Sequence, residues 1–156
     1  MSEQQTDAGQ QRIVVGVDGS PSSREALRWA VRQAELTGAS VEAITAWQSP
    51  TLVGLGAPFS ESEQSAGDDD RIKTAAENIM RAAVAEATAQ SAGVEVKAEV
   101  GEGSAAQFLL DAAHGATLVV VGSRGHGGIA GTLLGSVSQT LAQHSPCPVL
   151  IIRGVE

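Results

Sequence analysis

The sequence predicts a single α/β domain built on an open, five-stranded parallel sheet with helices on both faces. Valine-rich apolar runs recur at residues 12–18, 117–122 and 147–152, a pattern typical of strands buried on both faces. Segments with apolar residues at helical spacing separate the strands, as right-handed parallel connections require. The 156 residues, of which 42% are hydrophobic and 18% charged, suffice for one core. We expect a Rossmann-like strand order 3-2-1-4-5, with a flexible N-terminus over residues 1–11 and the domain over 12–156.

The first half of the chain is expected to form strand, helix and strand, followed by a long loop. After the strand at 12–18, Ser20 can cap a helix that opens with Pro21 and ends at Gly38. Residues 40–47 form the second strand. Residues 48–70 contain proline, glycine, serine and an acidic run at 68–70, which predicts a long surface loop, partly disordered. The acidic run is interpreted as the solvated start of the next helix rather than a metal site.

The second half is expected to continue the alternation. Its alanine-rich segment at 71–92 predicts a helix, and residues 94–100 alternate like a half-buried or edge strand. Ser104 and Gln107 have capping-box spacing and open a helix that runs to about His114. A strand at 117–122, a glycine-rich loop, a helix at about 133–144 and a strand at 147–152 complete the order.

Charge and composition exclude several classes of protein. The net charge of -8 opposes the phosphate backbone of nucleic acids, so no nucleic-acid partner is expected. No apolar run approaches the length that spans a bilayer, and the polar start lacks the apolar stretch of a signal peptide, so we expect a cytoplasmic protein without a membrane partner. Cys147 is the one cysteine, and no His, Cys, Asp and Glu residues cluster at metal-ligand spacing.

The loop after the fourth strand carries the strongest functional pattern. Residues 121–136 contain six glycines between a predicted strand and a predicted helix. Glycine lets a ligand approach the backbone, and successive N–H groups at a helix N-terminus bind anions. Ser136 can donate to a phosphate and Arg124 is the nearest cation, while His126 is as well explained as an exposed loop residue. The loop has no lysine, which excludes a Walker A motif.

The first strand ends in a second candidate, Asp18. Ligands of open parallel sheets bind beyond the carboxyl ends of the strands, where the strand order reverses. The loops that carry candidate ligand-binding residues follow the first strand, at Asp18, and the fourth strand, from Gly122 onward. We therefore expect these two strands to be neighbours in the sheet. Asp18 could cap the following helix, but Ser20 competes for that role, and ligand contact is therefore the favoured interpretation.

The spacing of Gly122, Gly125, Gly135 and Ser136, G-x2-G-x9-G-S, resembles the ATP-binding signature of the universal stress protein family. The resemblance extends to residues 17–20, the loop after the second strand, and residues 144–152. It implies an adenine-nucleotide-binding protein of the stress response. ATP, with Mg²⁺ brought by its phosphates, is the expected ligand, and AMP or cyclic AMP is the alternative.

The same resemblance implies roles for particular residues. The base would lie near Asp18 and Ala46, and the ribose and phosphates on Gly122, Gly125, Gly135 and Ser136. Further candidates around these positions are Val17, Gly19, Val121, Arg124 and His126. The family also forms homodimers through the last strand, here Val149, Leu150, Ile151 and Ile152, and such pairing would cover an apolar edge.

Catalysis is a less favoured alternative to binding. Hydrolysis needs a group that orients water near the phosphates, and the glycine-rich loop has no carboxylate. A slow ATPase and a dimeric scaffold with a vestigial site remain the other two hypotheses, and no catalytic residue is assigned.

Overall fold

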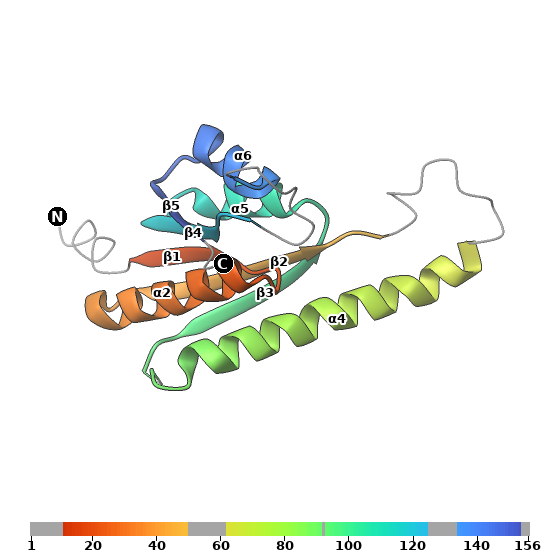
Figure 1. Cartoon of the computed structure of the whole chain (residues 1–156), viewed down its shortest axis with the longest axis horizontal. Coiled ribbons are helices and arrows are strands. Elements are labelled where there is room, and N and C mark those ends of the chain that lie inside the picture. The colour runs from red at the N-terminus through yellow and green to blue at the C-terminus, as the bar shows by residue number, and fades with distance from the viewer. Residues whose placement is uncertain (1–10, 50–61, 92, 125–133, 154–156) are drawn as a thin grey trace.

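The computed structural model describes residues 11–49, 62–91, 93–124 and 134–153, and over 62–67 only the course of a helix. The expected flexible N-terminus, most of the 48–70 loop, and Gly125 and His126 therefore lie outside the described residues. In these described ranges helices and strands alternate (Figure 1): β1 (Arg12–Gly16), α2 (Pro21–Thr37), β2 (Ser40–Trp47), α4 (Ser62–Thr88), β3 (Val96–Glu102), α5 (Ala105–Ala113), β4 (Leu118–Gly122), α6 (Ser136–His144) and β5 (Val149–Ile152).

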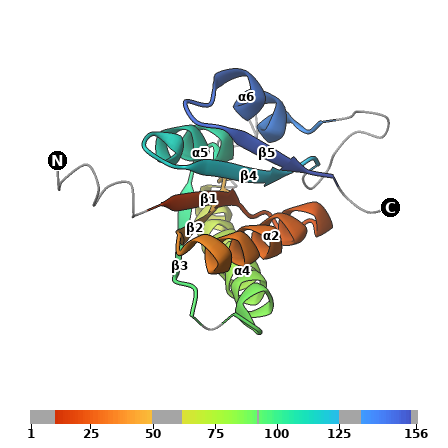
Figure 2. The ribbon, with the colours of Figure 1, turned by 90° about the vertical axis from the view of Figure 1, so that its left-hand side faces the viewer.

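The sheet is parallel throughout, in the order β3-β2-β1-β4-β5. This confirms the predicted fold class and the predicted neighbours β1 and β4, which pair from Ile13 with Leu118 to Val15 with Val120. Figure 2 shows α2 and α4 on one face of the sheet and α5 and α6 on the other. No helix in the described part of the chain combines the length and the apolar character that crossing a bilayer requires.

The core consists of two apolar layers, one on each face of the sheet. Ile13 and Val15 of β1 pack with α2 and α4, while Val14 packs with α5 and α6. All three are buried, with at most 3% of their surface exposed. The valine-rich run of β1 therefore supplies both layers, since successive side chains point to opposite faces.

Both ends of α2 form as the sequence predicts. Ser20 accepts a hydrogen bond from the Ser23 backbone N–H at 3.3 Å, and Pro21 follows in the first turn. Gly38 ends the helix with φ of 81°, a left-handed conformation that favours glycine. Five apolar residues at helical spacing between these caps are buried, namely Ala26, Leu27, Ala30, Val31 and Ala34, whereas Leu36 near the end of the helix is exposed.

The prediction for α4 is wrong at its start. The helix begins at Ser62 rather than residue 71, so the acidic run lies inside it instead of at its first turn. The prolines, glycines, serines and acidic run of residues 48–70 suggested a loop. However, Asp69 accepts a hydrogen bond from the Ser49 hydroxyl at 2.7 Å, a tertiary contact that no local pattern reveals. Figure 1 shows this first part of α4 reaching beyond the sheet. The helix also ends earlier, at Thr88, and β3 runs from 96 to 102 instead of 94 to 100.

The last two elements also begin later than predicted. The helix expected from 133 begins at Ser136, with Gly135 as its N-cap. The strand expected from 147 begins at Val149, after Pro148, which has no N–H to donate to the sheet.

Candidate functional site

A cleft of about 520 Å³ opens at the carboxyl ends of the strands. It lies where the end of β2 meets the first turns of α5 and α6. We call it the carboxyl-end cleft, and its lining residues are Ala46, Gln48, Gly103, Ser104, Ala105, Ala106, Ser136, Val137 and Thr140. Two predicted site residues far apart in the sequence, Ala46 and Ser136, thus border one cavity.

The cleft faces two helix N-termini. Ser104 caps α5 by accepting from the Gln107 N–H at 3.2 Å, which confirms the predicted cap. Gly135 is the N-cap residue of α6. Because glycine has no side chain, it cannot cap the helix with a side-chain hydrogen bond. Among the described residues, those that line the cleft carry no charged side chain. The positive ends of the two helix dipoles therefore favour an anionic group in this cleft.

Four described residues lie between β4 and α6, and three of them, Ser123, Arg124 and Gly135, form what we call the neck of the glycine-rich loop. The Gly135 N–H donates to the Ser123 carbonyl at 2.6 Å, and the Ser138 hydroxyl donates to the same carbonyl at 3.1 Å. The Ser123 N–H donates to the carbonyl of Ile152 at the end of β5. The start of α6 is thus bonded directly to the end of the sheet.

Asp18 is exposed, but its carboxylate already takes part in the local structure. One carboxylate oxygen accepts from the Ser20 N–H at 2.9 Å, and the Asp18 N–H donates to the Ser23 hydroxyl at 3.2 Å. Ser20 caps α2 as predicted, yet Asp18 also shapes the turn, in which Gly19 has a φ of 84°. Asp18 therefore has a structural role in this turn, even though Ser20 provides the cap of α2.

Gly122 packs directly against α2. A Cβ added at this position would lie 2.8 Å from the backbone carbon of Ser22 and 2.8 Å from its Cβ. A Cβ essentially never lies within 3.0 Å of a carbon atom outside its own chain neighbours, and a backbone atom cannot turn aside. A side chain at Gly122 would thus collide with α2, so glycine is required there for packing, and its predicted contact with phosphate stays a prediction.

The remaining predicted residues lie around the same edge of the sheet. Val17 and Val121 are each 3% exposed, and their side chains belong to the core. The Val17 carbonyl accepts a hydrogen bond from the Thr45 hydroxyl, which continues the contact of β1 with β2. Arg124 is exposed. Among the described site candidates, Ala46 and Ser136 line the cleft, whereas Asp18, Gly122 and Arg124 do not.

Three polar lining residues were missed as site candidates: Gln48, Ser104 and Thr140. Ser104 was recognised as a helix cap only. Because β3 is parallel to β1, the residues after it must reach the same edge of the sheet, and this signal could have added Ser104 to the candidates.

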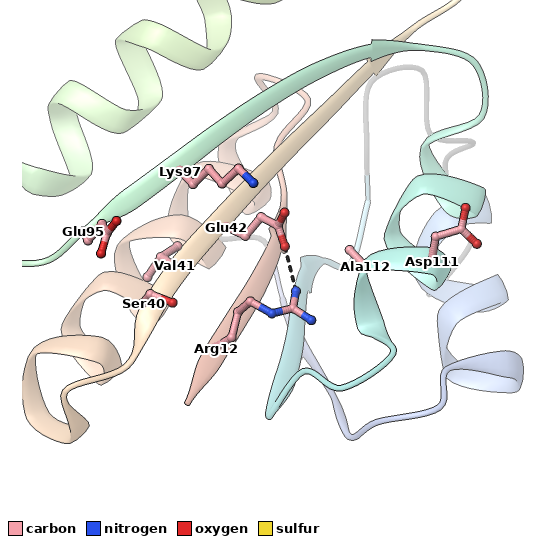
Figure 3. Close-up of a pocket in the computed structure, with 8 residues that line it drawn as sticks. All are labelled: Arg12, Ser40, Val41, Glu42, Glu95, Lys97, Asp111 and Ala112. Carbon is pink, nitrogen blue, oxygen red and sulfur yellow. Dashed lines mark hydrogen bonds and ion pairs between the residues drawn. The ribbon is translucent and has the colours of Figure 1, made fainter. Parts of the chain in front are cut away.

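A second hollow, of about 430 Å³, lies at the opposite, amino-terminal edge of the sheet (Figure 3). Its two basic residues, Arg12 and Lys97, each lie beside a carboxylate of the protein. Arg12 forms an ion pair with Glu42 at 2.7 Å and donates to the His114 carbonyl at 3.0 Å, and Lys97 lies 3.5 Å from Glu99. These bonds join β1, β2 and the end of α5, so we assign this hollow a structural role. No group of three His, Cys, Asp or Glu residues that could hold a metal occurs in the described ranges.

Comparison with known proteins gives one consistent result. Residues 10–153 match the family model of the Universal stress protein family. Universal stress protein Rv1996 of Mycobacterium tuberculosis is 32% identical over 161 residues, covering 97% of this chain and 50% of that protein. A universal stress protein of Mycolicibacterium smegmatis is 32% identical over 142 residues, covering 91% and 48%. The chain spans about half the length of these curated relatives.

Solved structures agree with the sequence comparison. Universal stress protein UspA from Lactobacillus plantarum superimposes with a TM-score of 0.78 at 23% identity, over 92% of this chain and 97% of that one, and shares the fold. A universal stress protein crystallised in complex with cAMP has a TM-score of 0.63 at 31% identity, over 92% of this chain and 97% of that one.

Proposed function

The chain belongs to the universal stress protein family, and from this premise we propose that it is a regulatory protein of the stress response that binds an adenine nucleotide in the carboxyl-end cleft. The observation that carries the proposal is the meeting of Ala46 and Ser136 at a cleft that faces two helix N-termini. The relative solved with cAMP supports the ligand class, since it is 31% identical over nearly the whole of both chains.

Within this proposal, the base lies toward the end of β2, near Ala46, with Asp18 at the neighbouring end of β1. The phosphates lie at the first turn of α6, where the backbone N–H groups that follow Gly135 and the Ser136 hydroxyl can donate to them, while the Gly135 N–H itself bonds to the Ser123 carbonyl. Gly125 would continue this cradle. Gly122 contributes through the position it gives to the neck of the loop.

ATP remains the nucleotide that we propose first, with cyclic AMP and AMP as alternatives. Mg²⁺ would accompany the phosphates of ATP. Binding rather than hydrolysis is the proposed activity, because the cleft-lining residues that the structure describes include no carboxylate to orient water. Release of inorganic phosphate from ATP, at a rate proportional to enzyme concentration and absent from a Gly135→Val variant, would favour the slow-ATPase alternative. The cytoplasmic location stays a prediction from the sequence.

A bound nucleotide is expected to raise the unfolding temperature of the nucleotide-free protein. A ligand at about a hundred times its Kd stabilises the folded state by about 2.7 kcal/mol. For a chain of this size that corresponds to roughly 5–10 °C. A thermal-shift series with ATP, AMP and cyclic AMP, with cytidine monophosphate as control, measures the effect. An unchanged unfolding temperature with all three adenine nucleotides would contradict the proposal.

We also propose that the protein forms a homodimer through β5. This strand is an edge of the sheet, and its four residues, Val149, Leu150, Ile151 and Ile152, are each half-buried in the single chain. Pairing with a second copy would cover this apolar edge.

Leu150→Glu is expected to change the mass in solution from twice 15.9 kDa to 15.9 kDa, because a charge on β5 would oppose the pairing of two such strands. Light scattering measures the mass, and thermal unfolding shows whether the variant remains folded. Leu36→Glu is the matched control, since Leu36 is 81% exposed on α2 and its replacement should leave the dimer intact. A folded Leu150→Glu protein of unchanged dimer mass would exclude this interface.

A further inference from the structure

Two serine hydroxyls of α2 hold the main chain where the glycine-rich loop leaves β4. The Ser22 hydroxyl donates to the Arg124 carbonyl at 2.7 Å, and the Ser20 hydroxyl donates to the same carbonyl at 3.2 Å. Both serines are buried, with 4% and 5% of their surface exposed. Both lone pairs of one carbonyl oxygen are thus engaged by neighbouring positions of a single helix turn.

The other end of the loop is held in the same manner. The Ser138 hydroxyl, on a residue that is 1% exposed, lies 3.1 Å from the carbonyl oxygens of both Ser123 and Gly135, and the Gly135 N–H also donates to the Ser123 carbonyl. The two successive carbonyls of the neck, those of Ser123 and Arg124, are therefore directed toward α6 and α2 respectively. Since each peptide unit is planar, fixing its carbonyl also fixes the plane from which the loop departs.

The contact between α2 and β4 makes this arrangement rigid. Gly122 lies so close to Ser22 that no Cβ fits between them, so the two segments cannot slide past each other without a backbone shift. An exposed carbonyl at a loop entrance would be satisfied by water. The two buried hydroxyls that donate to the Arg124 carbonyl not only complete its hydrogen bonding but also fix the direction in which this carbonyl points.

We propose that Ser22, assisted by Ser20, is a positioning residue of the glycine-rich loop. It holds the Arg124 carbonyl, and through it the course of the main chain toward the phosphate-binding positions, without touching the ligand. This role rests on the proposed function as far as phosphate affinity is concerned. The holding of the Arg124 carbonyl is a property of the protein alone and can be tested without nucleotide.

The first test is tryptic cleavage after Arg124, since the bond that trypsin cuts contains the carbonyl that Ser22 holds. Ser22→Ala is expected to increase the rate of this cleavage several-fold relative to cleavage after Arg81, within α4, which reports global unfolding. Ser91→Ala is the matched control, because Ser91 is also buried, at 7% exposed, and donates to Glu35 far from the loop. Equal cleavage ratios in Ser22→Ala, Ser91→Ala and the unaltered protein would overturn the proposal.

The second test is calorimetric titration of the same three proteins with cyclic AMP and with adenosine. Ser22→Ala is expected to weaken cyclic AMP binding about tenfold, the effect of one well-formed hydrogen bond, and to leave adenosine binding unchanged. A general loss of stability would weaken the binding of cyclic AMP and of adenosine to the same extent. Equal weakening of both ligands, or of neither, would overturn the positioning role. Faster cleavage of Ser22→Ala after Arg124 in a protein that binds no nucleotide would support the held carbonyl and overturn the proposed function instead.

Discussion

Gly122→Ala is expected to lower the free energy of unfolding by about 2–3 kcal/mol, toward the upper end of what overpacking costs. The added methyl group would lie 2.8 Å from the backbone carbon of Ser22, and a backbone atom cannot rotate away as a side chain can. Either β4 or the first turn of α2 must move. For a chain of this size the loss corresponds to roughly 5–10 °C in unfolding temperature.

Denaturant unfolding measures this change directly. Gly93→Ala is the matched control, since a Cβ at Gly93 meets nothing within 4 Å and its replacement should be nearly neutral. If Gly122→Ala unfolded at the same denaturant concentration as the unaltered protein, this would contradict the close packing of β4 on α2. The expected instability also means that a Gly122 variant cannot by itself identify a phosphate contact.

Gly135→Val is expected to lower nucleotide affinity by roughly a hundredfold or more while the protein stays folded. Gly135 has φ of -76° and ψ of 174°, an extended conformation that any residue adopts, and its N–H can still donate to Ser123. The fold should therefore lose only about 1 kcal/mol, for a poor helix cap. The branched side chain would stand at the start of α6, beside Ser136, where the phosphates are proposed to bind. Losing two charge-assisted hydrogen bonds there accounts for the expected factor.

Calorimetry compares Gly135→Val with Gly93→Val, the same replacement at the amino-terminal side of β3, far from the cleft. Thermal unfolding of both variants shows that the fold is retained. Normal affinity in the Gly135→Val protein would move the phosphate site away from the start of α6.

The sequence predicted the elements whose signals are local. The caps at Ser20, Gly38 and Ser104 were identified because each requires one residue type at one position. The apolar runs of β1 and β4 predicted central strands because both of their faces are buried. We predicted that β1 and β4 are neighbours because the loops after these strands carry the candidate ligand-binding residues, and the structure confirms this pairing.

The errors and omissions depend on contacts between distant residues. The start of α4 was misplaced because the bond from Ser49 to Asp69 joins positions on either side of a long connection. The sequence did not reveal that Ser22 lies so close to Gly122 that packing also requires glycine there, while the proposed phosphate contact of Gly122 stays a prediction. The hydroxyl groups of Ser20 and Ser22 look like ordinary residues of a helix start, and only the fold shows that they hold Arg124.

The central claim is tested most directly by calorimetric titration of the nucleotide-free protein with ATP, AMP and cyclic AMP. We predict saturable binding of at least one of them, with one site per chain, and the ranking of the three would distinguish an energy sensor from a second-messenger receptor. Saturation by none of the three, in a protein shown to be folded by thermal unfolding, would contradict the account and leave a scaffold whose cleft serves another purpose.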